Sequence, residues 1–324
     1  DEGAVCTRGL NFPGAAVPNG FHFITPSTSA GGRTIYDYHP ACKLTHFMVS
    51  HQASYHLLDH GVFMFMPNTS VDKPSAEACS AKARACSFLH EKEEARAHCY
   101  TVTLEEGTPA AGVKAEIAPT DHAAVIRFTY PAGSKQVNVI FDEVCEYIGA
   151  AGMRTAGSIT FHGGTFTAVV DSQSDLLTKG ASPMYVYGRF AAAPQSTWVM
   201  EGDQILAMAS FAPGTKEVVM QFGTSYISVE QAKKNLELEI APSDTLESVR
   251  DRAKALWNDL FCTIDVEGAS EEQKISLYSN LYRMYAYPTN YSENLGTSAA
   301  PRMAYASPYH TKDGKPVLTD GQMY

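Results

Sequence analysis

Short runs of apolar and β-branched residues, interrupted by turn residues, fill the chain from about residue 100 to 225. Gly163-Gly164 and Pro213-Gly214 supply turn chemistry between the runs. Runs of strand length at this spacing predict an antiparallel β-sandwich. The clearest runs are Cys99 to Leu104, Ala124 to Tyr130, Val137 to Phe141, Thr165 to Val170, Met184 to Phe190 and Val218 to Phe222.

After residue 227 the spacing of the apolar positions becomes helical, over 246–260 and again over 278–285. Three capping boxes, each a short polar residue followed three positions later by Gln or Glu, indicate helix starts. The pattern therefore predicts a sandwich followed by helices. The three boxes are Ser228 with Gln231, Asp244 with Glu247, and Ser270 with Gln273.

Two other segments have weaker patterns. Ser75 to His98 is rich in Ala, Lys and Glu, which predicts a helix or a loop that holds one helix. If it is one helix, Cys79 and Cys86 lie roughly 10 Å apart and cannot bridge each other. Tyr287 to Tyr324 is rich in Pro, Gly, Tyr and Asn and shows no strong period. We expect a long loop there, or a segment that other parts of the protein must order.

Composition excludes several classes of protein. With 324 residues, the chain is long enough for two hydrophobic cores. It has no run of eighteen apolar residues, so we expect no membrane span. A net charge of -10 without a basic stripe argues against nucleic acid as a partner.

The seven cysteines include no CxxC pair, so a zinc ribbon or a thioredoxin-type site has no support, while disulfides stay open. The chain starts at Asp1 without Met or a signal sequence, which suits a processed secreted or periplasmic protein, or a trimmed chain.

Five of the eleven histidines lie within 22 residues, and two of them have a spacing that could serve a metal. His56 and His60 are four positions apart, which on a helix places two imidazoles on one face, as zinc sites require. There is no HExxH, so loop histidines that brace the chain or contact a sugar are the alternative. The set is His39, His46, His51, His56 and His60.

Three adjacent acid pairs are candidates for glycosidase chemistry, which needs two carboxyls facing each other across a cleft. Neighbouring acids in sequence more often lie on solvated faces. The pairs are Glu93-Glu94, Asp142-Glu143 and Glu271-Glu272.

A series of short motifs in a fixed order carries a family resemblance. The first is Asn11-Phe12-Pro13-Gly14-Ala15, and Phe128-Thr129-Tyr130-Pro131 and Phe141-Asp142 lie in the predicted sandwich. The helical part adds Gly223-Thr224-Ser225-Tyr226-Ile227-Ser228, then Gln231-Ala232, Asn235-Leu236, Trp257-Asn258, Leu281-Tyr282 and Pro288. In order and spacing these motifs resemble glycoside hydrolase family 92, over nearly the whole chain.

The resemblance implies a mainly β chain: an N-terminal antiparallel β-sandwich, a helical linker, and the start of an (α/α)6 barrel that is truncated here. We expect the boundaries to be 1–227, 228–268 and 269–324. The family implies a calcium-dependent, inverting glycosidase that removes terminal α-linked mannose, for example in N-glycan degradation. The implied partners are mannose-containing glycans and a missing C-terminal catalytic domain or second chain.

The resemblance also suggests site residues, because the family's sugar lies between the sandwich and the barrel. Asn11 is the first candidate, for calcium and for a sugar hydroxyl; a structural turn asparagine is the alternative. His51 is a candidate donor to mannose, or else a loop-bracing histidine. Asp59 is a candidate sugar contact, or else a loop-stabilising carboxylate.

The family's general acid and general base would lie beyond Tyr324, so we expect no catalytic residue in this chain and no activity from it alone. A mannosyl phosphodiester as substrate stays open, because the acid position is missing. The alternative function from another class is a non-catalytic carbohydrate-binding or adhesion protein built on the sandwich.

Overall fold

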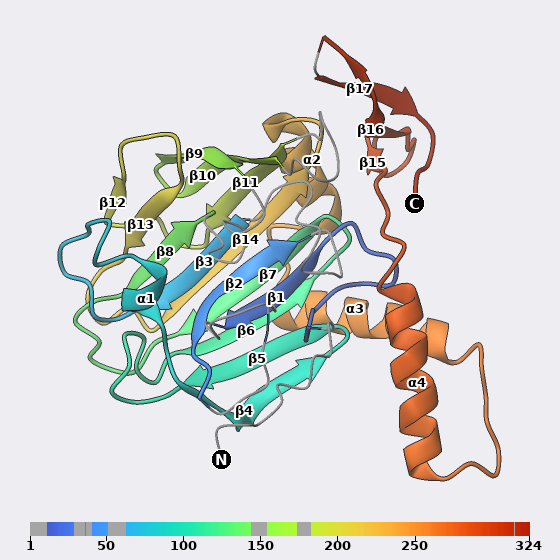
Figure 1. Cartoon of the computed structure of the whole chain (residues 1–324), viewed down its shortest axis with the longest axis horizontal. Coiled ribbons are helices and arrows are strands. Elements are labelled where there is room, and N and C mark those ends of the chain that lie inside the picture. Colours follow the sequence, from blue (N-terminus) through green and yellow to red (C-terminus); the bar gives the residue numbers. More distant parts are fainter. Residues whose placement is uncertain are drawn as a thin grey trace.

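The computed structural model describes residues 12–28, 36, 41–50, 63–143, 154–173, 183–313 and 315–324. In these ranges two antiparallel sheets pack face to face, helices follow, and a small β-ribbon ends the chain (Figure 1). The predicted mainly β fold, a sandwich followed by helices, is thereby confirmed.

The first sheet has six strands in the order β1-β2-β3-β8-β13-β12. Every neighbouring pair in it is antiparallel. Its strands are β1 (Phe23–Thr28), β2 (Leu44–Ser50), β3 (Phe63–Asn68), β8 (Asn138–Asp142), β12 (Ser196–Val199) and β13 (Leu206–Ser210).

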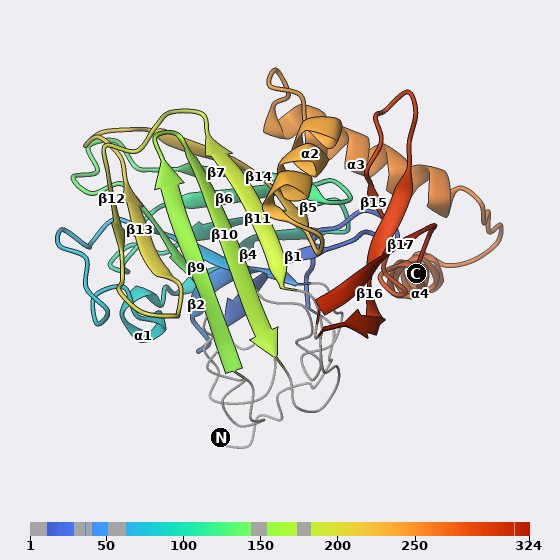
Figure 2. The same ribbon diagram turned by 90° about the horizontal axis from the view of Figure 1, so that it is seen from above.

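The second sheet has eight strands in the order β4-β5-β6-β7-β14-β11-β10-β9, again antiparallel throughout. Figure 2 shows its long strands β9, β10 and β11 side by side. The strands are β4 (Phe88–Arg96), β5 (Cys99–Leu104), β6 (Lys114–Pro119), β7 (Ala123–Thr129), β9 (Arg154–His162), β10 (Thr165–Gln173), β11 (Met184–Phe190) and β14 (Glu217–Ser225).

Aromatic rings fill the space between the two sheets. Phe63 and Phe65 from the first sheet meet Phe222 from the second, with ring centroids 6.2 Å and 5.8 Å away. The ring centroids of Phe166 and Phe141 lie 5.1 Å apart. Position 188 must be Gly to leave room for the Phe166 ring, because a Cβ there would lie 2.1 Å from that ring. These alternating inward side chains explain why the strand pattern was readable from the sequence.

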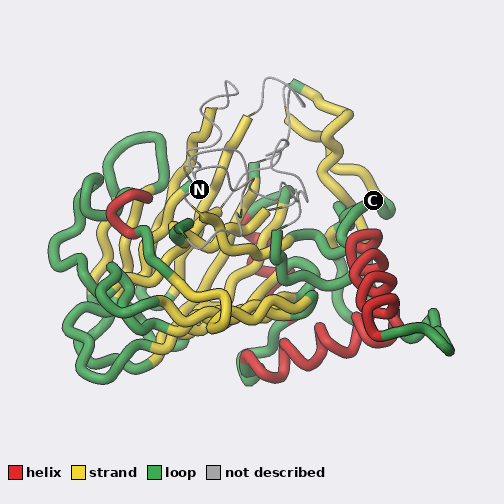
Figure 3. Tube along the Cα trace, turned by 60° about the horizontal axis from the view of Figure 1, so that its bottom comes forward, coloured by secondary structure: helices red, strands yellow, loops and turns green. Residues whose placement is uncertain are grey.

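Three longer helices follow the sandwich: α2 (Val229–Glu239), α3 (Leu246–Phe261) and α4 (Glu271–Tyr285). Figure 3 shows α3 and α4 at one side of the strands. Helix α2 packs on the outer face of the eight-stranded sheet, where Leu236 and Ile240 share a small core with Val125. Gly223 permits this approach, since a Cβ there would lie 2.3 Å from the Ala232 carbonyl oxygen.

The helix starts agree with two of the three predicted caps. Ser228 accepts from the Gln231 amide, and Ser270 forms the full box with Gln273. The predicted box at Asp244 is displaced by one residue: Thr245 is the N-cap of α3 and pairs with Ser248. Asp244 instead accepts hydrogen bonds from Arg252, at 2.7 Å and 3.0 Å.

Two predictions were wrong, one of them in part. The first half of the segment Ser75 to His98 is the expected alternative, a loop that holds one helix, α1 (Ala81–Arg84), but the second half is strand β4 at the edge of the eight-stranded sheet. Residues 287–324 are not a loop, because they form a ribbon of three antiparallel strands. These are β15 (Glu293–Asn294), β16 (Met303–Lys312) and β17 (Lys315–Asp320).

None of the helices in the described residues has the length and apolar character needed to cross a membrane. Among the described cysteines, four are free thiols: Cys79, Cys86, Cys99 and Cys262.

Candidate functional site

The predicted site residues Asn11, His51 and Asp59 lie outside the described residues, as do His39, His56 and His60. His46, the remaining member of the histidine-rich segment, is buried in β2. Burial, with the nearby Arg84 guanidinium, holds the pKa of His46 well below its usual value. His46 is therefore a neutral histidine of the core.

The adjacent acid pairs are not all on solvated faces, contrary to expectation. The side chain of Glu93, on strand β4, is 6% exposed and accepts hydrogen bonds from the hydroxyls of Tyr36 and Tyr100, at 2.7 Å and 2.6 Å. Asp142 is paired with the buried Arg84 at 2.6 Å. Hydrogen bonds and an ion pair thus hold these two carboxylates. Neither pair presents its two carboxyls to each other across a cleft, as a glycosidase acid and base would need.

One cluster of chemistry-bearing side chains stands out among the described residues: Asp121, His122 and Glu239. Asp121 and His122 form the turn between β6 and β7, and Glu239 is the last residue of α2. Docking of α2 on the sheet brings them together across 117 positions of sequence. The His122 Nδ1 lies 2.7 Å from Glu239 Oε1 and 3.6 Å from Asp121 Oδ2.

His122 is a buried imidazolium. Its Nε2 lies 3.0 Å from the Ser292 carbonyl oxygen, which can only accept, and its Nδ1 faces the Glu239 carboxylate. Both ring nitrogens must therefore carry hydrogen. Burial alone would lower the pKa of His122, but the charges of Asp121 and Glu239 outweigh it and raise the pKa to about 10.

The carboxylates of the cluster are also engaged. Glu239 Oε2 accepts from the Thr120 hydroxyl at 2.5 Å and from the His122 amide at 2.8 Å. Asp121 accepts from the Phe21 amide at 2.8 Å and from the Asn290 side chain at 3.0 Å. Burial works against ionisation of Glu239, yet the imidazolium and these donors lower its pKa.

This cluster does not fit the calcium that the family implies. Calcium takes six to eight oxygen ligands, whereas an imidazolium offers no lone pair and repels a cation. The cluster does not fit an inverting acid and base either, because those carboxyls lie roughly 6.5–9.5 Å apart with water between them. Here an imidazolium bridges two carboxylates whose ligand atoms lie within 4.8 Å of its own. The chemistry is that of an ion triad with a buried imidazolium and two partly exposed carboxylates.

The triad joins four parts of the chain. Its partners are the amide of Phe21 ahead of β1, the β6–β7 turn, α2, and Asn290 and Ser292 beyond α4. The Phe21 ring packs on the imidazole with a centroid distance of 4.5 Å. We conclude that the triad fixes the sandwich against the helical part.

A mostly apolar groove of about 770 Å³ runs beside the triad. Asp121 and Glu239 border it, and Arg252, whose guanidinium is paired with Asp244, lies at its rim. The N-terminal segment, the end of β6 with the turn after it, and α3 make up the rest: Val17, Pro18, Pro119, Thr120, Ala253, Ala255, Leu256 and Leu260.

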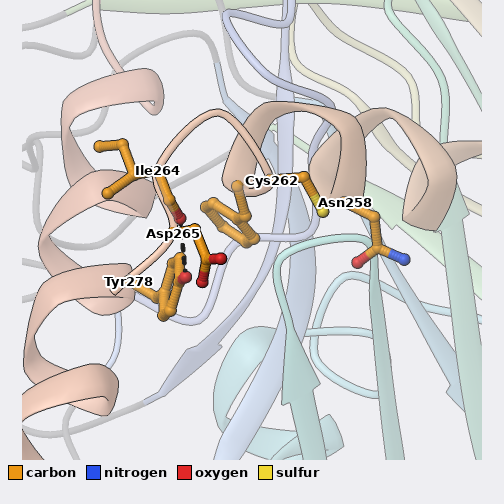
Figure 4. Close-up of a pocket in the computed structure, with 6 residues that line it drawn as sticks. Asn258, Cys262, Ile264, Asp265 and Tyr278 are labelled. Carbon is orange, nitrogen blue, oxygen red and sulfur yellow. Dashed lines mark hydrogen bonds between the residues drawn. The ribbon is translucent and has the colours of Figure 1, made fainter. Parts of the chain in front are cut away.

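A second hollow, of about 520 Å³, lies between α3 and α4 (Figure 4). Tyr278 reaches from α4 and donates its hydroxyl to the Ile264 carbonyl oxygen at 2.9 Å. Cys262 and Asp265, in the turn after α3, line the same space. Because Tyr278 is used to hold this turn, we interpret the hollow as a gap between packed helices.

The described residues thus reveal a site that the sequence analysis missed. Asp121 and His122 are adjacent, but Glu239, Asn290 and Ser292 are distant in sequence. The available signal was an Asp-His pair in a two-strand turn, directly before the β-rich run at Ala124. That signal does not name the third partner.

Comparison with known proteins identifies a family. A model described as the glycosyl hydrolase family 92 N-terminal domain matches residues 3–234. A second, described as the glycosyl hydrolase family 92 catalytic domain, matches residues 231–324.

Solved structures and a curated relative give the same picture. A family GH92 inverting mannosidase from Bacteroides thetaiotaomicron is 25% identical with a TM-score of 0.81, over 98% of this chain and 41% of that one. A family GH92 α-mannosidase from the same organism is 20% identical with a TM-score of 0.74, over 92% of this chain and 40% of that one. An uncharacterized secreted glycosidase of Arthroderma benhamiae is 23% identical over 242 residues, 66% of this chain and 31% of that protein. The chain spans less than half the length of these relatives.

Proposed function

The chain belongs to glycosyl hydrolase family 92, and we propose that it is the N-terminal portion of a secreted or periplasmic enzyme that removes terminal α-linked mannose with inversion. The observation that carries the proposal is the likeness to the inverting mannosidase, which extends over 98% of this chain and across both matched domains. In this proposal the chain supplies the sandwich (1–227), the linker (228–268) and the first part of the barrel (269–324).

The proposal assigns roles by position. Asn11, His51 and Asp59 remain our candidates for contacts to the sugar. Asp142 and Glu239 are excluded as the reacting pair, because the Arg84 guanidinium and the His122 imidazolium occupy them. We therefore propose that the Glu and Asp that act as general acid and general base belong to the remainder of the barrel.

Calcium belongs to the same proposal. A bound calcium ion would hold sugar hydroxyls through hard oxygen ligands. Asp121, His122 and Glu239 do not provide such a site, so we propose that calcium is held elsewhere, with Asn11 as the contribution of this chain. Titration of calcium into Asn11→Ala and His122→Gln variants separates the two assignments, because only the first should weaken binding.

The decisive experiment follows the first product of the full-length protein acting on an α-mannoside, by proton NMR. Inversion predicts that β-mannose appears first and that a chelator abolishes turnover. If α-mannose appears first, the inverting mechanism is wrong. The 324-residue chain alone should show no turnover; chelator-sensitive hydrolysis by it would contradict our assignment of the catalytic carboxylates to the remainder of the barrel.

A further inference from the structure

The segment 14–19, which we call the anchor segment, begins three residues after Asn11 and is held mainly by helices that lie more than 200 positions later in sequence. The Trp257 Nε1–H of α3 donates to the Ala16 carbonyl oxygen at 2.7 Å. The Tyr282 hydroxyl of α4 donates to the Gly14 carbonyl oxygen at 2.9 Å. Both donors are side chains on rigid helices, so they can set the position of this backbone.

The end of the anchor segment is tied to the same helical part. The Asn19 amide donates to the Tyr285 carbonyl oxygen at 2.8 Å, and its side chain donates to the Pro288 carbonyl oxygen at 2.6 Å. The Asn290 amide in turn donates to the Asn19 carbonyl oxygen at 2.8 Å. Asn19 adopts a positive φ of 52°, a conformation that Asn tolerates better than most residues. The segment is therefore fastened at both ends.

Packing stiffens the two donors. Trp257 is 2% exposed and contacts the Tyr282 ring with a centroid distance of 5.2 Å. Phe261 packs on Trp257 at 5.4 Å. The sandwich adds fewer ties to this stretch, through Ala15 paired with Ile24 and the Ala16 amide bonded to the Ala97 carbonyl oxygen. An aromatic cluster on the helices thus contributes to fixing the backbone of the anchor segment.

We propose that Trp257 and Tyr282 are positioning residues. They hold the anchor segment, which leads to Asn11 in the sequence, in a fixed position relative to helices α3 and α4. The inference rests on the proposed function, because Asn11 is there a contact to sugar and calcium. Neither aromatic residue touches the substrate in this proposal. Each acts by holding a carbonyl oxygen of the anchor segment.

The test compares two tyrosines one turn apart on α4. Tyr282→Phe removes the hydroxyl that holds Gly14, and Tyr278→Phe removes one that makes an equally long bond, 2.9 Å, to Ile264. A hydrogen bond of this kind stabilises by about 0.5–1.5 kcal/mol, which corresponds to roughly threefold to tenfold in an equilibrium. Both variants lose one hydroxyl and keep the ring, so their melting temperatures should be similar.

Hydrogen exchange of the amides in 14–20 is the first readout. Tyr282→Phe should speed exchange there by roughly threefold to tenfold, whereas Tyr278→Phe should leave it as in the wild type. Turnover of an α-mannoside by the full-length protein is the second readout. Tyr282→Phe should raise KM by a similar factor with little change in kcat, because a contact to the sugar is displaced in ground and transition states alike.

A second pair repeats the test with the two tryptophans of the chain. Trp257→Phe loses the donor to Ala16, and Trp198→Phe on β12 is its control. The inference is wrong if exchange in 14–20 is equal in Tyr282→Phe and Tyr278→Phe, or if exchange differs and KM does not. A wild-type protein without turnover contradicts the proposed function instead, and the exchange comparison still decides whether the helices hold the anchor segment.

Discussion

At the scale of single residues, the buried imidazolium of His122 is the charge whose removal we expect to affect the free energy of unfolding most. Removing one partner of a fully buried ion pair costs about 3–5 kcal/mol, but water reaches the two carboxylates that would remain here, because the Asp121 and Glu239 side chains are 36% and 21% exposed. We therefore predict that His122→Gln lowers the free energy of unfolding by a smaller amount, about 1–3 kcal/mol, at pH 7. Urea denaturation measures it, with His162→Gln, an exposed histidine on β9, as the control within about 0.5 kcal/mol of the wild type.

The raised pKa of His122 also predicts how the stability of the fold changes with pH. The pKa of His122 rises from 6.5 to about 10 on folding, so the native state holds a proton that the unfolded chain releases. The contribution to stability is complete below pH 6.5 and is lost as the pH rises toward 10. His122→Gln should flatten this loss and His162→Gln should keep it. An unchanged slope in His122→Gln would show that the triad is not charged.

Glu143 is a buried acid whose ionisation should lower the stability of the fold. Ionisation of a salt-bridged carboxylate has the opposite effect. Its Oε1 accepts from the Ile205 amide at 3.0 Å, while its Oε2 has no partner among the described residues. Burial, with Asp142, Asp203 and Asp171 nearby, raises its pKa from 4.5 to about 7. Asp142, the first of these acids, is paired with Arg84 at 2.6 Å.

The raised pKa predicts a loss of stability as pH increases. The folded state keeps the Glu143 proton up to about pH 7, whereas the unfolded chain releases it near 4.5, so stability falls between these values. The fall should reach roughly 2–4 kcal/mol, at 1.36 kcal/mol per pH unit. Glu143→Gln should abolish it, and Glu217→Gln, on an exposed position of β14, should not. Thermal melts from pH 4 to 8 would contradict us if both variants behaved alike.

The site shows what single residues in a sequence can and cannot predict. His46 and Glu93 belong to conspicuous polar clusters in sequence, yet His46 is buried in the core and the Glu93 carboxylate is bonded to two tyrosine hydroxyls. His122 stood out less and is the centre of the triad, because its partners Glu239 and Ser292 come from other elements. The sequence shows where polar residues cluster along the chain. Which of them contact each other depends on the docking of α2 and on the path of the chain beyond α4.

At the scale of elements, strands with one buried face were predictable and edge strands were not. Met184–Phe190 alternates strictly between buried and partly buried positions, and β11 coincides with the predicted run. Phe88–Arg96 buries only its first residue and carries charges along its length, as edge strands do. Its Ala, Lys and Glu content favours a helix locally. Pairing with β5 overrides that preference, and pairing between β16 and β17 likewise orders the tail.

The contact between α2 and the sheet depends on Gly223, which the sequence showed only as part of a family motif. Gly223→Ala would place a Cβ 2.3 Å from the Ala232 carbonyl oxygen and 2.9 Å from Leu236 Cβ. We expect a loss of about 1–3 kcal/mol, the usual cost of overpacking, measured by urea denaturation. Gly164→Ala is the matched control, because its Cβ would meet nothing closer than 3.7 Å. Equal stability of the two variants would show that α2 can shift outward freely.

At the scale of the whole molecule, the helical part is at once an anchor and an exposed surface. Its inner side holds the sandwich through Trp257, Tyr282 and the triad. Away from these contacts, α4 exposes two large apolar side chains, Ile275 at 64% and Met284 at 68%, which lie nine positions apart and therefore on opposite faces of the helix. Exposed apolar side chains promote association, because burial of their surface is favourable.

We therefore predict that the 324-residue chain self-associates through α4. Ile275→Glu combined with Met284→Glu should weaken the association by about tenfold or more, equivalent to 1.4 kcal/mol, because a charge cannot be buried in such a contact without a partner. Sedimentation velocity over a concentration series measures this. Leu89→Glu with Val199→Glu is the control, since these residues are 37% and 41% exposed on the sandwich, away from α4. A wild-type chain that stays monomeric at every concentration would refute the prediction, and equal weakening by both pairs would place the contact elsewhere.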